Sequence, residues 1–214
     1  MSNIDYSLMY VTDERIKDDN AFFQILQDSL QGGATIIQLR EKSMPSRELY
    51  HRALKAKKLC DSYHVPLIIN DRLDIALAID AKGLHVGQQD LPATAARRIL
   101  GPNKIIGLSI SNAMQLNEAN KLPIDYVGLS PIFPTSTKTT NLDKPVGLEG
   151  LKKFSRLSKF PIISIGGIDE NNAIAVIEHG SAGIAVVSAI SQAKNPSKAT
   201  EKLKHLICKT GTNI

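Results

Sequence analysis

The sequence has few cysteines, few aromatic residues and no long apolar run, and each scarcity argues against a class of protein. Only 2 of its 214 residues are cysteines, Cys60 and Cys208. They lack metal-ligand spacing, so we expect thiols rather than a disulfide or a zinc site. No apolar stretch is as long as a membrane span, and the acidic first segment lacks the basic-then-apolar pattern of a signal peptide. We therefore expect a cytoplasmic protein with no membrane partner.

Aromatic residues make up only 5% of the chain, too few for the stacking platforms that bind single-stranded nucleic acid. The net charge is +5, from 26 basic and 21 acidic residues, but the basic residues are scattered over helical segments such as ELYHRALKAKKLC. We interpret them as solvated helix faces and expect no nucleic-acid partner. The modest positive excess is better suited to small anionic metabolites.

Short β-branched runs alternate with segments whose apolar residues recur at helical spacing. The predicted strands cover residues 8–12, 34–39, 66–70, 83–87, 104–109, 125–129, 161–165 and 183–187. The predicted helices cover residues 18–31, 46–63, 72–80, 92–100, 112–120, 147–158, 170–179 and 196–208. In the second helix, Leu49, Ala53 and Ala56 should face the core, with Arg and Lys on the opposite side. Asn112 and Asp169 should cap later helices.

Eight strands alternating with eight helices predict parallel strands joined by right-handed crossovers. The chain is long enough for one domain, residues 1–214, and leaves little room for a second. A doubly wound sheet would give the same pattern, because periodicity does not reveal closure. Eight units with short strands of similar length favour an α/β fold of the (β/α)8 or TIM-barrel type, whose active site lies at the C-terminal ends of the strands.

Most of the predicted strands end abruptly in polar residues or glycine. The segments at these strand ends contain Gln38, Leu39, Arg40, Glu41 and Lys42 in the second strand and after it, then Asn70, Asp71, Asp90, Ser109, Gly166, Gly167, Val187 and Ser188. Because the C-terminal ends of barrel strands meet at one face, we expect these residues to form a single site.

Asp71 and Asp90 follow the third and fourth strands, so they should be neighbours. Proteins usually hold Mg²⁺ with one or two carboxylates, leaving the other positions to water and phosphate. Either aspartate alone could be a helix cap or a turn residue. As a pair they favour a Mg²⁺ site, with Asn70 as an uncharged group beside it.

Cations and hydroxyls suited to phosphate lie at the same strand ends and in the long connection 130–148. Arg40, Lys42 and Lys138 supply positive charge, and Ser109 could donate to a phosphate oxygen. A second anion region should combine the hydroxyl run before Lys138 with the ends of strands seven and eight. Its members are Thr135, Ser136, Thr137, Gly167, Val187 and Ser188.

The sequence shows no Ser-His-Asp order, Cys-His pair or zinc spacing. Four of the five histidines fall in helices or at helix ends facing away from the expected site. His85 lies within a strand, where a buried, hydrogen-bonded role is favoured over catalysis. Two anion regions, a metal and no nucleophile suit the joining of two phosphorylated small molecules with departure of a phosphate group.

The motifs that carry this chemistry resemble those of the thiamine phosphate synthase family, and the resemblance covers nearly the whole chain. The motifs are QLREK, IINDR, GLHVGQQDLP, IIGLSISN, DYVGLSPIFPTSTK, ISIGGI and VVSAI. The resemblance implies a Mg²⁺-dependent transferase of thiamine biosynthesis. Such an enzyme joins 4-amino-2-methyl-5-hydroxymethylpyrimidine diphosphate to a thiazole phosphate or its carboxylated form. The products are thiamine phosphate and diphosphate, with CO₂ also lost from the carboxylated form.

The resemblance also implies a role for each matching residue. Residues that would contact the pyrimidine diphosphate are Gln38, Leu39, Arg40, Glu41, Lys42, Asn70, Ser109 and Lys138, and those that would hold the thiazole phosphate are Thr135, Ser136, Thr137, Gly167, Val187 and Ser188. Asp71 and Asp90 would bind Mg²⁺. The implied reaction is dissociative: diphosphate leaves first, and the thiazole nitrogen captures the pyrimidine carbocation. Arg40, Lys42, Ser109 and Lys138 would be the catalytic residues, because they would stabilise the departing charge.

Two other functions fit parts of this pattern. A thiazole tautomerase, a related barrel of similar length, would not require the full set of diphosphate and metal residues. A catalytically silent phosphate-binding regulator would be indicated by loss of a cation or a metal carboxylate, and none is missing here. The complete set therefore favours the synthase. The sequence does not indicate an oligomeric state.

Lys138→Ala should lower kcat more than it affects thiazole binding, because the lysine is expected to neutralise the departing diphosphate. Steady-state kinetics with each substrate varied in turn would separate the two effects. Unchanged turnover would contradict the role assigned to Lys138.

Overall fold

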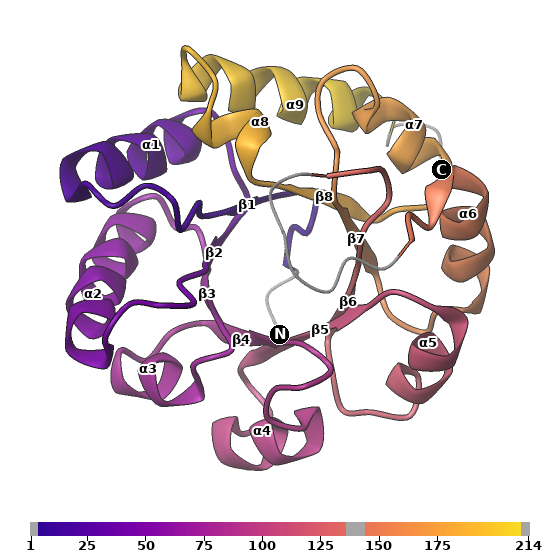
Figure 1. Cartoon of the computed structure of the whole chain (residues 1–214), viewed down its shortest axis with the longest axis horizontal. Helices are drawn as coiled ribbons and strands as arrows, with labels where there is room; N and C mark the ends of the chain where they lie inside the picture. The colour runs from indigo at the N-terminus through magenta and orange to yellow at the C-terminus, as the bar shows by residue number, and fades with distance from the viewer. Residues whose placement is uncertain (1–3, 136–143, 211–214) are drawn as a thin grey trace.

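In the computed structural model, which describes residues 4–135 and 144–210, eight parallel strands close into a barrel in the order of the chain (Figure 1). The strands are β1 (Leu8–Val11), β2 (Ile36–Leu39), β3 (Leu67–Asn70), β4 (Gly83–Val86), β5 (Ile105–Ile110), β6 (Tyr126–Leu129), β7 (Ile162–Ile165) and β8 (Gly183–Val186). The helices are α1 (Asp19–Gln31), α2 (Ser46–Ser62), α3 (Leu73–Ala78), α4 (Ala93–Leu100), α5 (Ala113–Ala119), α6 (Gly147–Leu157), α7 (Ala173–Glu178), α8 (Ser188–Ser191) and α9 (Pro196–Thr210). The predicted (β/α)8 barrel is confirmed.

Two helix starts differ in how well the sequence predicted them. Asn112 caps α5 as expected, because its side chain accepts a hydrogen bond from the Gln115 amide at 3.0 Å. Asp169 does not cap α7. Its carboxylate accepts from the Asn171 amide at 2.8 Å, which forms a turn, and the helix begins only at Ala173. The sequence reading also missed α8, a single short turn of helix between β8 and α9.

Side chains alternate between the two sides of the barrel wall, as parallel strands require. Met9, Ile36, Ile68 and Ile163 belong to the cluster that fills the barrel interior. Their strand neighbours belong to the larger cluster between the barrel and its helices. In β2 the side chains of Ile36 and Gln38 point inward. The same alternation continues in the residues that follow the strand.

One prediction about α2 was wrong. Leu49, Ala53 and Ala56 are buried as expected, but Arg52 is buried with them instead of facing solvent. Its Nη1 lies 2.7 Å from Glu41 Oε1, and its Nε donates to Asp19 at 3.0 Å. The guanidinium also lies 4.6 Å from the centroid of the Phe22 ring. Helical periodicity alone could not reveal these partners, because they come from other segments.

The Glu41 side chain is fully buried at the junction of β2 and α2. Burial raises the pKa of Glu41, and the hydrogen bond and positive charge of Arg52 offset only part of that effect. Its second oxygen, Oε2, has no hydrogen-bond partner among the described residues. The Glu41–Arg52 ion pair therefore ties the segment after β2 to α2.

The remaining sequence expectations about cysteine and membranes can be placed on the fold. Cys60 is buried in α2 and Cys208 is exposed on α9, and no disulfide joins them. Within residues 4–135 and 144–210, none of the helices combines the length and the apolar character needed to cross a membrane.

Arg52→Ala should lower the free energy of unfolding by about 3–5 kcal/mol, because it leaves the buried Glu41 carboxylate without its partner. Lys57→Ala is the matched control on the same helix. It breaks the more exposed Lys57–Asp61 ion pair and should cost at most about 1 kcal/mol. Urea unfolding followed by circular dichroism measures both. Equal losses would show that the buried pair stabilises the fold no more than a surface pair.

Candidate active site

A cavity of about 1270 Å³ lies at the C-terminal ends of the strands, and all eight strands contribute residues to its lining. Its walls carry most of the residues expected from the sequence. These are Gln38, Arg40, Lys42, Asn70, Asp71, Asp90, Ser109, Thr135, Gly166, Gly167, Val187 and Ser188. Ser136, Thr137 and Lys138 lie outside the described residues. Convergence of the strand ends on one cavity is therefore confirmed for the part of the chain described.

Two of the expected residues do not line the cavity. Leu39 and Glu41 are buried on the outer side of the barrel wall, Leu39 in the core under the helices and Glu41 against Arg52. The cause is the alternation that begins in β2, which sends Gln38, Arg40 and Lys42 to the cavity and the residues between them outward. Their side chains therefore hold the QLREK segment in place.

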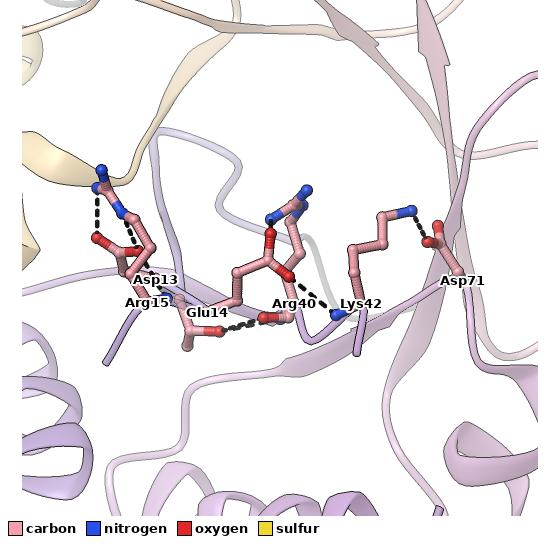
Figure 2. Close-up of polar contacts among 7 residues, drawn as sticks. Asp13, Glu14, Arg15, Arg40, Lys42 and Asp71 are labelled. Carbon is pink, nitrogen blue, oxygen red and sulfur yellow. Dashed lines mark hydrogen bonds and ion pairs between the residues drawn. The ribbon is translucent and has the colours of Figure 1, made fainter. Parts of the chain in front are cut away.

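The carboxylate of Glu14, which follows β1, contacts both basic residues of this segment (Figure 2). Arg40 Nη1 lies 2.6 Å from Glu14 Oε1, and the backbone amide of Lys42 donates to Glu14 Oε2 at 3.0 Å. Burial opposes ionisation of Glu14, but these hydrogen bonds outweigh it and lower the pKa of Glu14. The Arg40 amide also donates to Thr12 Oγ1 at 2.9 Å. Glu14 therefore holds the guanidinium of Arg40 and the backbone of Lys42 in place.

The Lys42 ammonium reaches across to the end of β3, where it contacts Asp71 (Figure 2). Burial raises the pKa of Asp71, Lys42 lowers it, and the neighbouring Asp90 carboxyl raises it again, so the net shift is upward. The side-chain hydrogen bond between Asp71 and Asp90 shows that the two carboxyl groups lie side by side, as expected from the sequence. Asp90 Oδ2 also accepts from the Gly87 amide at 2.7 Å.

Asp71 adopts a left-handed backbone conformation, with φ of 61°. Glycine adopts this conformation readily, and among the other residues aspartate and asparagine adopt it most often. From this position the Asp71 side chain lines the cavity. Residues in such conformations cluster at functional sites.

The Asp71–Asp90 pair fits the donor chemistry of Mg²⁺. Within the described ranges, no group of three or more His, Cys, Asp or Glu side chains could hold a metal ion. A cation at this position would therefore take two carboxylates from the protein and its other oxygens from water or phosphate, which is the usual arrangement for Mg²⁺.

Ser109 lines the cavity from β5, and its hydroxyl is held from below by His85. The Ser109 Oγ lies 2.8 Å from His85 Nε2, and the Tyr126 hydroxyl lies 2.8 Å from His85 Nδ1. Burial lowers the pKa of His85 to about 4, so the imidazole is neutral at neutral pH. Burial also raises the pKa of Tyr126, against which a hydrogen bond from the Gln38 side chain acts. His85 is thus buried and hydrogen-bonded, as the sequence indicated.

The opposite wall is built from the ends of β7 and β8. Gly166 and Gly167 have positive φ angles of 104° and 65°, and the first residues after β6 lie against them. The amides of Ile132 and Phe133 donate at 3.0 Å to the carbonyls of Ile165 and Gly166. A Cβ at Gly167 would lie 2.6 Å from the carbonyl oxygen of Pro134. Both glycines are therefore required by backbone shape and by space.

This wall offers backbone donors rather than charged side chains. In the described part of the chain, the amides of Gly167 and Ser188 have no acceptor. Asn172 Nδ2 donates to the Gly167 carbonyl at 2.8 Å, which fixes the orientation of this peptide. Val187 and Ser188 line the same part of the cavity, where β8 passes into α8. Exposed amides of this kind are suited to a phosphate group.

Sequence reasoning missed the residues that follow β1. Asp13, Glu14 and Arg15 all line the cavity, and Arg15 Nη2 pairs with Asp13 Oδ2 at 2.7 Å (Figure 2). The signal was present, because VTDER follows the first apolar run just as QLREK follows the second. Applying the strand-end rule to β1 would have found them. Tyr126 also lines the cavity but is the first residue of β6, far from the polar residues that follow the strand, so it gives no such signal.

Comparison with known proteins agrees with the fold and with the resemblance that the sequence motifs carry. The model of the thiamine monophosphate synthase family matches residues 8–190. A thiamine-phosphate synthase of Vibrio parahaemolyticus is 48% identical over 202 residues, which cover 94% of this chain and 98% of the relative. Another, of Persephonella marina, is 42% identical over 207 residues, covering 97% and 98% of the two chains.

Solved structures agree with these sequence matches. A thiamine phosphate pyrophosphorylase from Pyrococcus furiosus superposes with a TM-score of 0.88 at 37% identity, covering 97% of this chain and 98% of its own. A 3-hexulose-6-phosphate synthase superposes with a TM-score of 0.72 at 17% identity, which shows a shared fold alone. The length of the family match and the identity to these relatives place this chain in the thiamine monophosphate synthase family.

Proposed function

We propose that this protein joins 4-amino-2-methyl-5-hydroxymethylpyrimidine diphosphate to 4-methyl-5-(2-phosphoethyl)thiazole or its 2-carboxy form. The products would be thiamine phosphate and diphosphate, with CO₂ lost as well from the carboxy form. The observation that carries the proposal is a single cavity with two walls whose groups are suited to anions. Cations and paired carboxylates line the β2–β4 side, and exposed amides line the β7–β8 side.

The first wall suits the pyrimidine diphosphate. Arg40 offers a planar fork for phosphate oxygens, and Lys42 offers a compact charge that can leave Asp71 for the substrate. Gln38 and Asn70 add uncharged groups beside them, and Ser109 adds a hydroxyl. Lys138, outside the described residues, is proposed to complete this set from the sequence alone.

Asp71 and Asp90 are proposed to hold Mg²⁺. When bound there, the ion would neutralise charge on the diphosphate as it leaves. The Asp71 backbone and the Gly87–Asp90 hydrogen bond keep both carboxylates in position for that role. Lys42, released from Asp71, would share the charge of the same leaving group.

The proposed reaction is dissociative, and the protein contributes positioning and charge rather than a nucleophile. The bond between the pyrimidine methylene carbon and the diphosphate oxygen breaks first, and both electrons leave with diphosphate. The thiazole nitrogen then forms a bond to the resulting carbocation. Arg40, Lys42, Ser109 and Lys138 are proposed to stabilise the departing negative charge, which is where catalysis by electrostatics is most effective.

The second wall suits the thiazole phosphate. The amides of Gly167 and Ser188 can donate to its phosphate oxygens, with Val187 beside them. Thr135 lines the cavity next to this wall and is proposed to contribute together with Ser136 and Thr137, which lie outside the described residues. Two fixed walls would hold the thiazole nitrogen near the pyrimidine, which lowers the entropic cost of reaction.

The two rival functions predicted from parts of the sequence are less favoured. The tautomerase needs no diphosphate, whereas Arg40, Lys42, Asp71 and Asp90 all line this cavity. The silent regulator would be expected to lack part of this set. A cytoplasmic location stays a prediction of the sequence.

Mixing the purified protein with both substrates and Mg²⁺ should release diphosphate and form thiamine phosphate in equal amounts. Mass spectrometry and a diphosphate assay measure the two products. A chelator should abolish both, and added Mg²⁺ should restore them, because the metal is proposed to neutralise the leaving group. Product formation without diphosphate release, or activity unaffected by chelator, would contradict the proposal.

Asp71→Asn should lower kcat by at least about 100-fold, since loss of roughly 3 kcal/mol of charge stabilisation corresponds to that ratio. Asparagine tolerates the left-handed backbone at this position, so the fold should be retained. Asp74→Asn, on the neighbouring helix α3, removes an exposed carboxylate and should leave kcat unchanged. Comparable losses in both variants would rule out a specific role for Asp71.

A further inference from the structure

We propose that His85 and Tyr126 are positioning residues that orient the Ser109 hydroxyl, so that its hydrogen points into the cavity toward the leaving diphosphate. This inference rests on the proposed function and adds to it two residues that contribute through Ser109. The argument follows from the placement of three side chains on adjacent strands, from the space left for them, and from the direction of their hydrogen bonds.

The three side chains come from β4, β5 and β6, which are neighbours in the barrel. His85 pairs in register with Gly107, and Gly107 pairs with Tyr126, so all three positions lie at one level of the wall. Ser109 stands two residues further along β5, at the level of the cavity. The imidazole therefore bridges a buried phenol below and a cavity-lining hydroxyl above, with 2.8 Å on each side.

Two strand glycines make room for this bridge. A Cβ at Gly107 would collide with the Tyr126 ring and with His85 Nδ1, where the two side chains meet. A Cβ at Gly128 would lie 3.0 Å from His85 Cε1. Glycine inside a strand weakens it and often marks a place where another group approaches closely. Here both glycines leave the space in which the imidazole contacts Tyr126 and Ser109 together.

The direction of the bridge is set at its lower end. Tyr126 carries a phenol, which is more acidic than the aliphatic hydroxyl of Ser109 and is therefore the better donor and the poorer acceptor. Of the two hydroxyls that contact the imidazole, Tyr126 therefore gives its hydrogen to His85 Nδ1. A neutral imidazole with Nδ1 as acceptor carries its hydrogen on Nε2. Nε2 then donates to Ser109 Oγ.

The consequence lies at Ser109. With one lone pair of Oγ occupied by the His85 N–H, the serine hydrogen cannot point back to the imidazole. Among the described residues, the hydroxyl has no contact other than His85. Its hydrogen is thus directed to the cavity, where an anionic oxygen would accept it. A donor that is already oriented stabilises developing charge without reorganising during the reaction.

The tautomer of His85 is the first test, and it needs no substrate. Nitrogen-15 NMR of the imidazoles distinguishes the protonated ring nitrogen from the bare one, and the spectrum of His85→Gln identifies the His85 signals by their loss. We expect hydrogen on Nε2 and none on Nδ1 in the wild-type protein. Hydrogen on Nδ1 would reverse the direction of the bridge and overturn the proposal.

Kinetics of a mutant cycle provide the second test. Tyr126→Phe removes the donor to His85 and should lower kcat about 10-fold with little change in KM, since loss of one oriented hydrogen bond to a charged group is of that size. In a Ser109→Ala background the same change should have no further effect, because Ser109 carries the coupling. An undiminished Tyr126→Phe effect in that background would contradict action through Ser109.

Tyr6→Phe is the matched control. The Tyr6 ring packs 5.5 Å from the Tyr126 ring and its hydroxyl lies outside the bridge, so kcat should not change. Thermal unfolding of each variant separates lost stability from lost orientation. If the wild type forms thiamine phosphate while Tyr126→Phe and Tyr6→Phe behave alike, the inference fails and the proposed function stands. If the wild type makes no product, the proposed function fails, and the NMR test still decides the direction of the bridge.

Discussion

The buried ion pair between Glu41 and Arg52 is the contact on which the cationic wall of the site depends. It anchors the outward-facing residue of a segment whose neighbours on either side face the cavity. Burying two charges is costly, and here an aromatic ring and a second carboxylate share the Arg52 guanidinium. The anchor holds this segment against α2, and Arg40 and Lys42 of the same segment contact Glu14 and Asp71. The stability of α2 and the arrangement of charges at the barrel mouth are thereby linked.

Both walls of the cavity are suited to anions, but one uses charged side chains and the other uses backbone amides. On the β2–β4 side, Lys42 and Asp71 form an ion pair, so any anion or cation that bound there would have to displace one of these side chains from the other. On the β7–β8 side, backbone amides offer partial positive charge that needs no counter-ion, and two glycines with positive φ provide their shape. A diphosphate that departs and a monophosphate that stays bound would call for this difference between mobile and fixed charge.

Much of the fold could be predicted from the sequence, because buried faces require apolar residues at the period of a helix or a strand. All eight strands were placed within two residues of their observed bounds, and Asn112 was recognised as a cap. The site followed as far as polar residues come directly after apolar runs. What failed depended on contacts distant along the chain: Glu41 looked like a ligand until Arg52 was seen beside it. Asp169 looked like a cap, although Asn171 and Asn172 draw it into a turn. Roles of the site residues stay predictions.

Gly107 has a consequence for how this barrel can vary. Its missing side chain is the volume in which His85 and Tyr126 touch, so any larger residue there would push the two rings apart. Loss of bulk at position 126 would make room for a methyl group at 107, but it would also remove the phenol that contacts the imidazole. These positions should therefore covary across related chains as one unit, with glycine at 107 accompanying tyrosine at 126. A strand position without a side chain thus determines whether His85 and Tyr126 can be in contact.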